Sequence, residues 1–96
     1  MNKSLGTLLL ALLVCSVAAP ASATCYYAYK AKQDNPLQLH YGVIGVEGVC
    51  RRSNNETEIR SRLSRAGWTL LVLLSEVPQT KLNSYQEQAG EYFLRY

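Results

Sequence analysis

The stretch Asn55–Val77, NETEIRSRLSRAGWTLLVLLSEV, decides the expected fold, because a helix pattern, a stop signal and an apolar strand follow one another in it. Ile59, Leu63 and Ala66 recur at helical spacing among arginines and serines, which predicts a helix with one narrow apolar stripe. Gly67 stands where a helix commonly ends in a left-handed residue.

The segment WTLLVLL, which begins at Trp68, is predicted to be the most buried strand of a small sheet. Side chains along a strand alternate between its two faces. One face is expected to hold Trp68, Leu70, Val72 and Leu74, and the other Leu71 and Leu73. This pattern predicts a fold and indicates no chemistry.

Residues 1–23 have the three-part layout of a secretory signal peptide. Lys3 supplies a positive start, Leu5–Ala19 is uncharged and mostly apolar, and Ala21-Ser22-Ala23 offers the small residues that signal peptidase reads. We therefore expect cleavage after Ala23 and one small domain over residues 24–96, in the periplasm or outside the cell.

Two membrane-anchored alternatives are less favoured. The apolar run is shorter than the roughly 20 residues that a membrane-spanning helix needs, so we expect no permanent span. A lipoprotein signal would end at Cys15, but Val14 occupies the position where a small residue is wanted.

The charge of the chain argues against nucleic acid as a partner. The net charge is +3, and removal of the segment that carries Lys3 leaves about +2. Strong phosphate binding needs many clustered cations, and no run of five or six like charges is present.

The cysteines predict a disulfide. After cleavage two remain, Cys25 and Cys50, and an even pair in a small exported chain is typical of a disulfide that adds about 3–4 kcal/mol to stability. A metal site is disfavoured because only His40 could join them, whereas structural zinc uses four ligands. We expect no metal and no cofactor.

An antiparallel hairpin is expected at the start of the domain. Residues 24–32 and 37–46 alternate like strands, and the turn Gln33–Pro36 separates them. This register places Cys25 opposite Gly45 or Val46, so the chain after Val46 has to turn back for Cys50 to reach it. Several glycines in and after the second strand suggest a bulge or bend: Gly42, Gly45 and Gly48.

The helix is expected to begin at an N-cap among Ser53, Asn54 and Asn55 and to run to about Ala66. Its arginines are interpreted as a solvated face held by i,i+4 ion pairs, with an anion-binding surface as the alternative. Those pairs are Glu56 with Arg60 and Glu58 with Arg62.

The remaining chain completes a β-β-α-β-β order. Gln79–Gly90 is polar and is expected to be a long loop, and Glu91–Tyr96 a closing strand with Tyr92, Leu94 and Tyr96 inward. The expected fold is α+β: a four-stranded antiparallel sheet with one helix packed on one face. One helix leaves the second face uncovered, which suggests a partner protein or a homodimer.

Parts of this pattern resemble a known family. Ala66-Gly67-Trp68, the following Leu70-Leu71-Val72 and the closing Tyr92-Phe93-Leu94-Arg95 are similar to a small bacterial domain family of unknown function, the 4177-like domains with a Gly-Trp strand motif. The resemblance covers roughly Ile59–Tyr96 and the tyrosine-rich first strand. It implies a compact α/β fold and no particular activity, and the cysteine pair and export signal are additions to that pattern.

No catalytic residue is predicted. His40, the only histidine, is expected to be a surface or lightly packed residue rather than a general base, and an enzyme would need a pocket that joins it to a carboxylate. The chain contains no phosphate-binding loop and no nucleophile elbow.

A non-catalytic interaction or envelope accessory module is therefore the favoured hypothesis, with a small-ligand carrier and a small enzyme or enzyme subunit as alternatives. The many tyrosines either cap the core or line a binding face. The residues proposed to contact a partner are Lys81, Tyr85, Tyr26 and Phe93.

Overall fold

A computed structural model describes residues 23–96, so the predicted signal peptide lies outside the described residues apart from Ala23. The fold is α+β, with a three-stranded antiparallel sheet in β-β-α-β order and helices packed on it. The elements are β1 (Thr24–Gln33), β2 (Gln38–Glu47), α2 (Arg52–Arg65), β3 (Thr69–Val77), the 3₁₀ helix η1 (Gln79–Tyr85), α3 (Gln86–Ala89) and the 3₁₀ turn η2 (Gly90–Tyr92).

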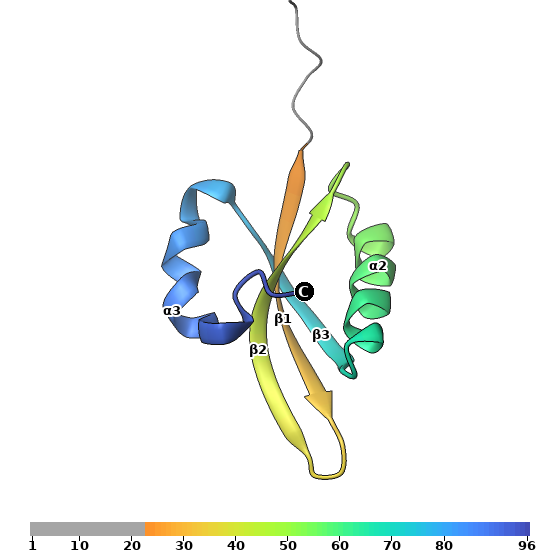
Figure 1. The fold of residues 1–96 in the computed structure, drawn as a ribbon. Helices are drawn as coiled ribbons and strands as arrows, with labels where there is room; N and C mark the ends of the chain where they lie inside the picture. The colour runs from red at the N-terminus through yellow and green to blue at the C-terminus, as the bar shows by residue number, and fades with distance from the viewer. Residues whose placement is uncertain (1–22) are drawn as a thin grey trace, which may run out of the picture.

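The central strand is β1. The strand order is β2-β1-β3, so β3 lies at an edge of the sheet (Figure 1). The prediction that the apolar strand after Gly67 is the most buried one was therefore wrong. Tyr27 and Tyr29 of β1 are 1% and 0% exposed, whereas Leu71 and Val72 of β3 are open to solvent. Large apolar content made β3 resemble a central strand, but the tyrosine-rich strand occupies that place.

The hairpin has the predicted register. Cys25 lies opposite Val46, and the ladder runs without interruption to Gln33 opposite Gln38. The bulge suggested by the glycines of β2 is absent from this ladder. Two of these glycines instead face tyrosine rings across the strands. Tyr29 lies opposite Gly42, and Tyr26 lies opposite Gly45.

The Tyr29–Gly42 pair is sterically exclusive. A Cβ atom added to Gly42 would lie 2.5 Å from the Tyr29 hydroxyl, closer than real contacts allow. At Gly45 the nearest atom would be a ring carbon of Tyr26 at 3.0 Å. Gly42 is therefore required so that the fully buried ring of Tyr29 can lie against the neighbouring strand.

β3 departs from simple alternation at two points. Its pairing with β1 shifts between Ala28 and Tyr29 and again between Lys30 and Ala31. These two irregularities leave Leu74 and Leu71 without a partner on β1 and turn both Leu70 and Leu73 into the core. The predicted alternation along Leu70–Leu74 was wrong for this reason.

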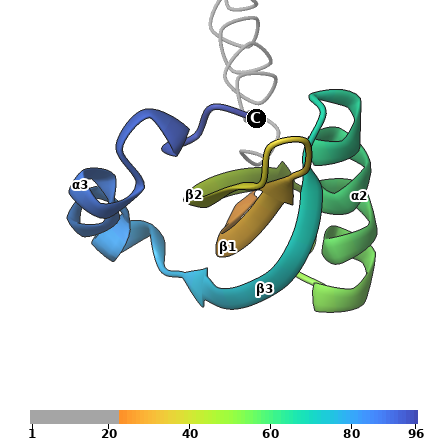
Figure 2. The same ribbon diagram turned by 90° about the horizontal axis from the view of Figure 1, so that it is seen from below.

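The sheet is covered on both faces, but unequally. Helix α2 lies on one face, and the η1–α3 segment lies on the other (Figure 2). The main core lies under α2 and joins residues of all three strands to the helix: Cys25, Tyr27, Tyr29, Ala31, Ile44, Val46, Ile59, Leu63, Trp68, Leu70 and Leu73. A smaller buried set lies outside this core, namely Ala28, Val43, Val77 and Ala89.

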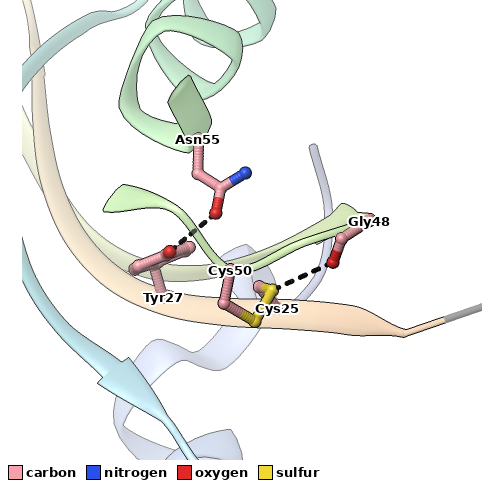
Figure 3. The surroundings of a disulfide bond; sticks show 5 residues. All are labelled: Cys25, Tyr27, Gly48, Cys50 and Asn55. Carbon is pink, nitrogen blue, oxygen red and sulfur yellow. Dashed lines mark hydrogen bonds between the residues drawn. A yellow bond between two sulfur atoms is a disulfide. The ribbon is translucent and has the colours of Figure 1, made fainter. Parts of the chain in front are cut away.

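Helix α2 begins earlier than predicted. Its N-cap is Arg51, no side chain caps it, and Asn55 lies one turn inside. The capping prediction was wrong, since all three candidate residues lie inside the helix, and the Asn55 side chain has another partner. Its Oδ1 accepts a hydrogen bond of 2.7 Å from the buried hydroxyl of Tyr27 (Figure 3).

The end of α2 follows the prediction. Gly67 has φ of +89°, and its N–H donates to the Ser64 carbonyl. The N–H of Trp68 donates to the Leu63 carbonyl, which completes a Schellman motif. Trp68 and Leu63 are both buried, as the hydrophobic contact of this motif requires.

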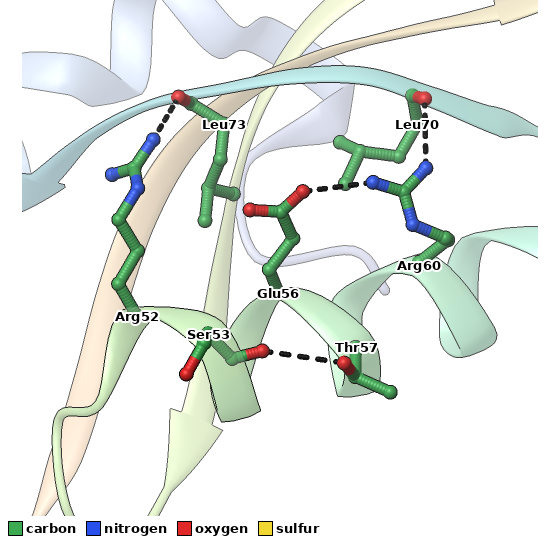
Figure 4. Close-up of polar contacts among 7 residues, drawn as sticks. All are labelled: Arg52, Ser53, Glu56, Thr57, Arg60, Leu70 and Leu73. Carbon is green, nitrogen blue, oxygen red and sulfur yellow. Dashed lines mark hydrogen bonds and ion pairs between the residues drawn. The ribbon is translucent and has the colours of Figure 1, made fainter.

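Three arginines of α2 donate hydrogen bonds to backbone carbonyls of the sheet. The interpretation of these arginines as a solvated face did not predict this. Arg52 and Arg60 donate to the carbonyls of Leu73 and Leu70 on β3, at 2.5 and 3.4 Å (Figure 4). Arg62 donates to the carbonyl of Gly45 on β2 at 2.6 Å and to the backbone oxygen of Tyr96 at 3.0 Å. The predicted ion pairs are also present, Glu56 with Arg60 at 2.8 Å and Glu58 with Arg62 at 3.4 Å.

The C-terminal region corrects two predictions. Gln79–Gly90 is largely helical rather than a loop, and Glu91–Tyr96 is not a strand. Only one isolated parallel bridge joins Phe93 to Val43, where the N–H of Leu94 donates to the Val43 carbonyl at 2.8 Å. From there Tyr92 and Tyr96 pack against the main core. The segment 91–96, called the tail below, therefore passes around the β2 edge (Figure 2).

The predicted disulfide joins Cys25 and Cys50, with the Cα atoms 5.5 Å apart (Figure 3). The reversal that brings Cys50 back occurs at Gly48, which has φ of +104°. The Gly48 N–H donates to the Ala23 carbonyl at 2.8 Å, and its carbonyl lies 3.4 Å from Cys25 Sγ. The disulfide thus closes the sheet end onto the start of α2.

Reduction of this disulfide is expected to lower the free energy of unfolding by about 3–4 kcal/mol, because the unfolded chain regains the entropy of a loop that spans 25 positions. Thermal unfolding with and without reductant measures this loss. An unchanged melting temperature, with two free thiols detected in the native protein, would contradict it.

The substitution Gly42→Ala is expected to destabilise the protein by about 1–3 kcal/mol, because the new methyl group overlaps the immobile Tyr29 ring. Gly45→Ala is the matched control, since the Tyr26 ring opposite it is only half-buried and has room to shift. Urea unfolding compares the two variants, and equal losses would argue against the steric role of Gly42.

Candidate functional site

The residues predicted to contact a partner lie around the second face and its helical cover. Tyr26 of β1 is half-buried beside Gly45, and Phe93 is half-buried at its bridge with Val43. Tyr85 ends η1 and Lys81 lies exposed within it. Three of the four are therefore half-buried, and only Lys81 is fully accessible.

The cover formed by η1 and α3 leaves part of the second face open. The hairpin of β1 and β2 extends past both helices (Figure 1). Leu39, Leu71 and Val72 are 66%, 49% and 44% exposed. The term open face is used here for Lys30, Leu39, Tyr41, Leu71 and Val72.

A shallow hollow of about 280 Å³ lies in the open face. Its lining comes from all three strands and is mostly apolar: Lys30, Ala31, Leu39, His40, Tyr41 and Leu71. Lys30 and Val72 are cross-strand neighbours, so Val72 adjoins the same surface. Burial raises the pKa of Tyr41, and the nearby Tyr85 raises it further, so Tyr41 stays an uncharged phenol at neutral pH.

His40 is buried rather than at the surface, which corrects its predicted position. Only 8% of the residue is exposed, and its ring faces the main core. Its Nε2 shares a hydrogen bond of 2.8 Å with the hydroxyl of Tyr29. The partner of His40 is thus a phenol instead of the carboxylate that a general base would use.

Aromatic rings enclose His40. The ring of Tyr92 stacks on it with centroids 3.7 Å apart, and Trp68 meets it edge-on at 4.3 Å. The guanidinium of Arg95 lies over the rings of Tyr92 and Tyr96 at 5.8 and 5.7 Å. The tail therefore closes over the histidine through stacking contacts.

This enclosure keeps both members of the hydrogen-bonded pair neutral. Burial lowers the pKa of His40 from its usual 6.5, Arg95 lowers it further, and Glu91 opposes them. Burial also raises the pKa of Tyr29 well above its usual value of 10.0, with Tyr96 and Tyr92 adding to the effect. The Nδ1 atom of His40 is buried without a hydrogen-bond partner, so a proton added there would be a poorly solvated charge.

One group of metal-ligating residue types lies together in residues 23–96. The sulfurs of Cys25 and Cys50 and a carboxylate oxygen of Glu76 are within 4.8 Å of one another. The two sulfurs are joined in the disulfide, and metal binding by cysteine needs the thiolate. The oxidised protein therefore offers a single carboxylate there.

Sequence reasoning predicted an uncovered second face but not all of its residues, and it missed the enclosure of His40. The two shifts that expose Leu71 and Val72 are invisible to a period-of-two pattern. One signal was available for His40: it shares the parity of Ile44 and Val46 along β2, which placed it on their side of the sheet.

Acidification is expected to destabilise the protein through His40. The folded pKa lies below the unfolded value of about 6.5, so the stabilising effect is complete above that pH and is lost as the pH falls through the folded pKa. Melting temperatures measured from about pH 7.5 to about pH 5 should fall more steeply than in the variant His40→Phe.

The variant His40→Phe retains an aromatic ring against Tyr92 but cannot be protonated. It leaves the Tyr29 hydroxyl unpaired and is therefore expected to be less stable at neutral pH by about 1–3 kcal/mol. If the melting temperatures of the two proteins fall equally with pH across this range, His40 is excluded as the source of the acid sensitivity.

Among the described residues, none of the helices combines the length and apolar character needed to cross a membrane. No protein-family model matches the chain, and neither a curated protein nor a solved structure matches it.

Proposed function

We propose that this protein is an exported, non-catalytic interaction module that binds a protein of the envelope or the extracellular space through its open face. The observation that carries the proposal is the mostly apolar hollow around Leu39 and Leu71, with Val72 beside it. Exposed apolar surface is costly in water unless a partner covers it.

Export is supported by two independent features. The sequence before Thr24 has the layout of a signal peptide, and the domain contains a disulfide between Cys25 and Cys50. Disulfides persist in oxidising compartments, so the periplasm or the extracellular space is the proposed location.

A protein surface is favoured over the alternatives for reasons of size and access. The hollow of about 280 Å³ lies at the lower end of the range of roughly 300–1,000 Å³ for pockets that enclose small ligands, and it is open rather than enclosing. Catalysis is not proposed, because the hydroxyl of Tyr29 and the ring of His40 are buried under the tail, where they serve to hold the core together.

The proposal predicts that Leu71→Ser abolishes capture of a specific partner, since it places a hydroxyl group in the apolar hollow. The experiment uses the oxidised, tagged protein as bait in envelope extract or culture fluid. Val49→Ser is the matched control, because Val49 is 72% exposed and lies in the β2–α2 connection.

The melting temperature should be similar in both variants, because both residues are exposed. Equal capture by the two variants, or no specific partner for the parent protein, would reject the open face as a binding surface. Lys81→Ala and Tyr85→Ala extend the test, and loss of capture there would add η1 to the proposed surface.

A further inference from the structure

The hollow in the open face is lined by a positive charge and by no negative one. Lys30 lines the hollow, and none of the seven Asp and Glu residues of the chain is part of that lining. Lys32 follows on the same face, but its ammonium lies 3.4 Å from the Asp34 carboxylate. Lys30 forms no ion pair within residues 23–96.

This charge pattern disfavours a second copy of the chain as the occupant. A two-fold contact places the same surface against itself, so each Lys30 would approach an identical apolar and cationic surface. No carboxylate of the lining would meet it. Like charges brought together in an interface are unfavourable, whereas an acidic partner would pair with Lys30.

The adjoining edge of β2 indicates an extended occupant. β2 lies at the edge of the sheet, and its bridge to the tail is confined to Val43. From Gln38 to Gly42 its outer edge has no neighbouring strand in the part of the chain that the structure describes. An extended peptide gains main-chain hydrogen bonds at such an edge and specificity from side chains that enter adjacent hollows.

We propose that the open face binds an extended acidic segment of a partner protein. The segment pairs with the β2 edge between Gln38 and Gly42, places one large apolar side chain in the hollow against Leu39 and Leu71, and pairs a carboxylate with Lys30. This inference rests on the proposed function and specifies the chemistry of the partner.

The test is selection from a phage-displayed library of random linear peptides on the immobilised, oxidised protein. Enriched peptides should contain aspartate or glutamate close to leucine, isoleucine or phenylalanine. Synthetic versions should bind Lys30→Glu at least about tenfold more weakly than the parent protein, because the charge pair becomes repulsive. They should also lose affinity for Leu39→Ser.

Arg65→Glu is the matched charge-reversal control. Arg65 lies exposed on α2, which covers the opposite face, and its change alters the net charge of the protein by the same amount as Lys30→Glu. Unchanged peptide binding by Arg65→Glu is expected. Equally weakened peptide binding in Arg65→Glu and Lys30→Glu would show that only the overall charge of the protein matters, and it would overturn the role of Lys30.

Three other outcomes would overturn the inference. Enriched peptides without acidic residues would show that the partner supplies no carboxylate to Lys30. The absence of any enriched peptide would show that the open face does not bind an extended segment. In either case, if capture of a natural partner still depends on Leu71, the proposed function is supported although the inference about the acidic segment is wrong. Sedimentation that shows a dimer, dissociated by Leu71→Ser, would assign the open face to a second copy.

Discussion

The hydroxyl end of Tyr29 is the point on which the arrangement of the sheet depends. Its ring is fully buried in the central strand, over a β2 residue that has to be glycine, and its oxygen pairs with His40. A register shift in β3 begins next to it. Because His40 stacks on Tyr92, the same contact fixes where the tail folds over the core. One buried polar pair thus joins the central strand to β2 and, through the stacked ring of Tyr92, to the end of the chain.

The sequence predicts each helix and strand of this fold better than it predicts which of them lie side by side. The hairpin, its register, the disulfide and the glycine stop of α2 follow from turn chemistry, alternation and spacing, which act over a few residues. The position of β3 was mispredicted because apolar content reports burial but not which strand lies in the middle. The tail was mispredicted as a strand because aromatic residues favour strands, whereas Tyr92 and Tyr96 are held by stacking over His40 and by Arg62.

The candidate site was foreseen only in outline. An uncovered face follows from counting one helix against two faces of a sheet, and part of the second face is indeed open. Leu71 was placed on that face, but Leu73 and Val72 were each assigned to the wrong side, because the pairing of β3 with β1 is irregular, a non-local property. The residues chosen instead, Tyr26, Tyr85 and Phe93, are half-buried.

The arginines of α2 have a consequence for assembly. Arg52 and Arg60 occupy carbonyls of β3, so this edge of the sheet offers fewer free acceptors to an incoming strand, whereas part of β2 stays available. Growth of a sheet from molecule to molecule needs two receptive edges. A sheet whose second edge is partly blocked adds further molecules poorly, which favours discrete complexes over fibres.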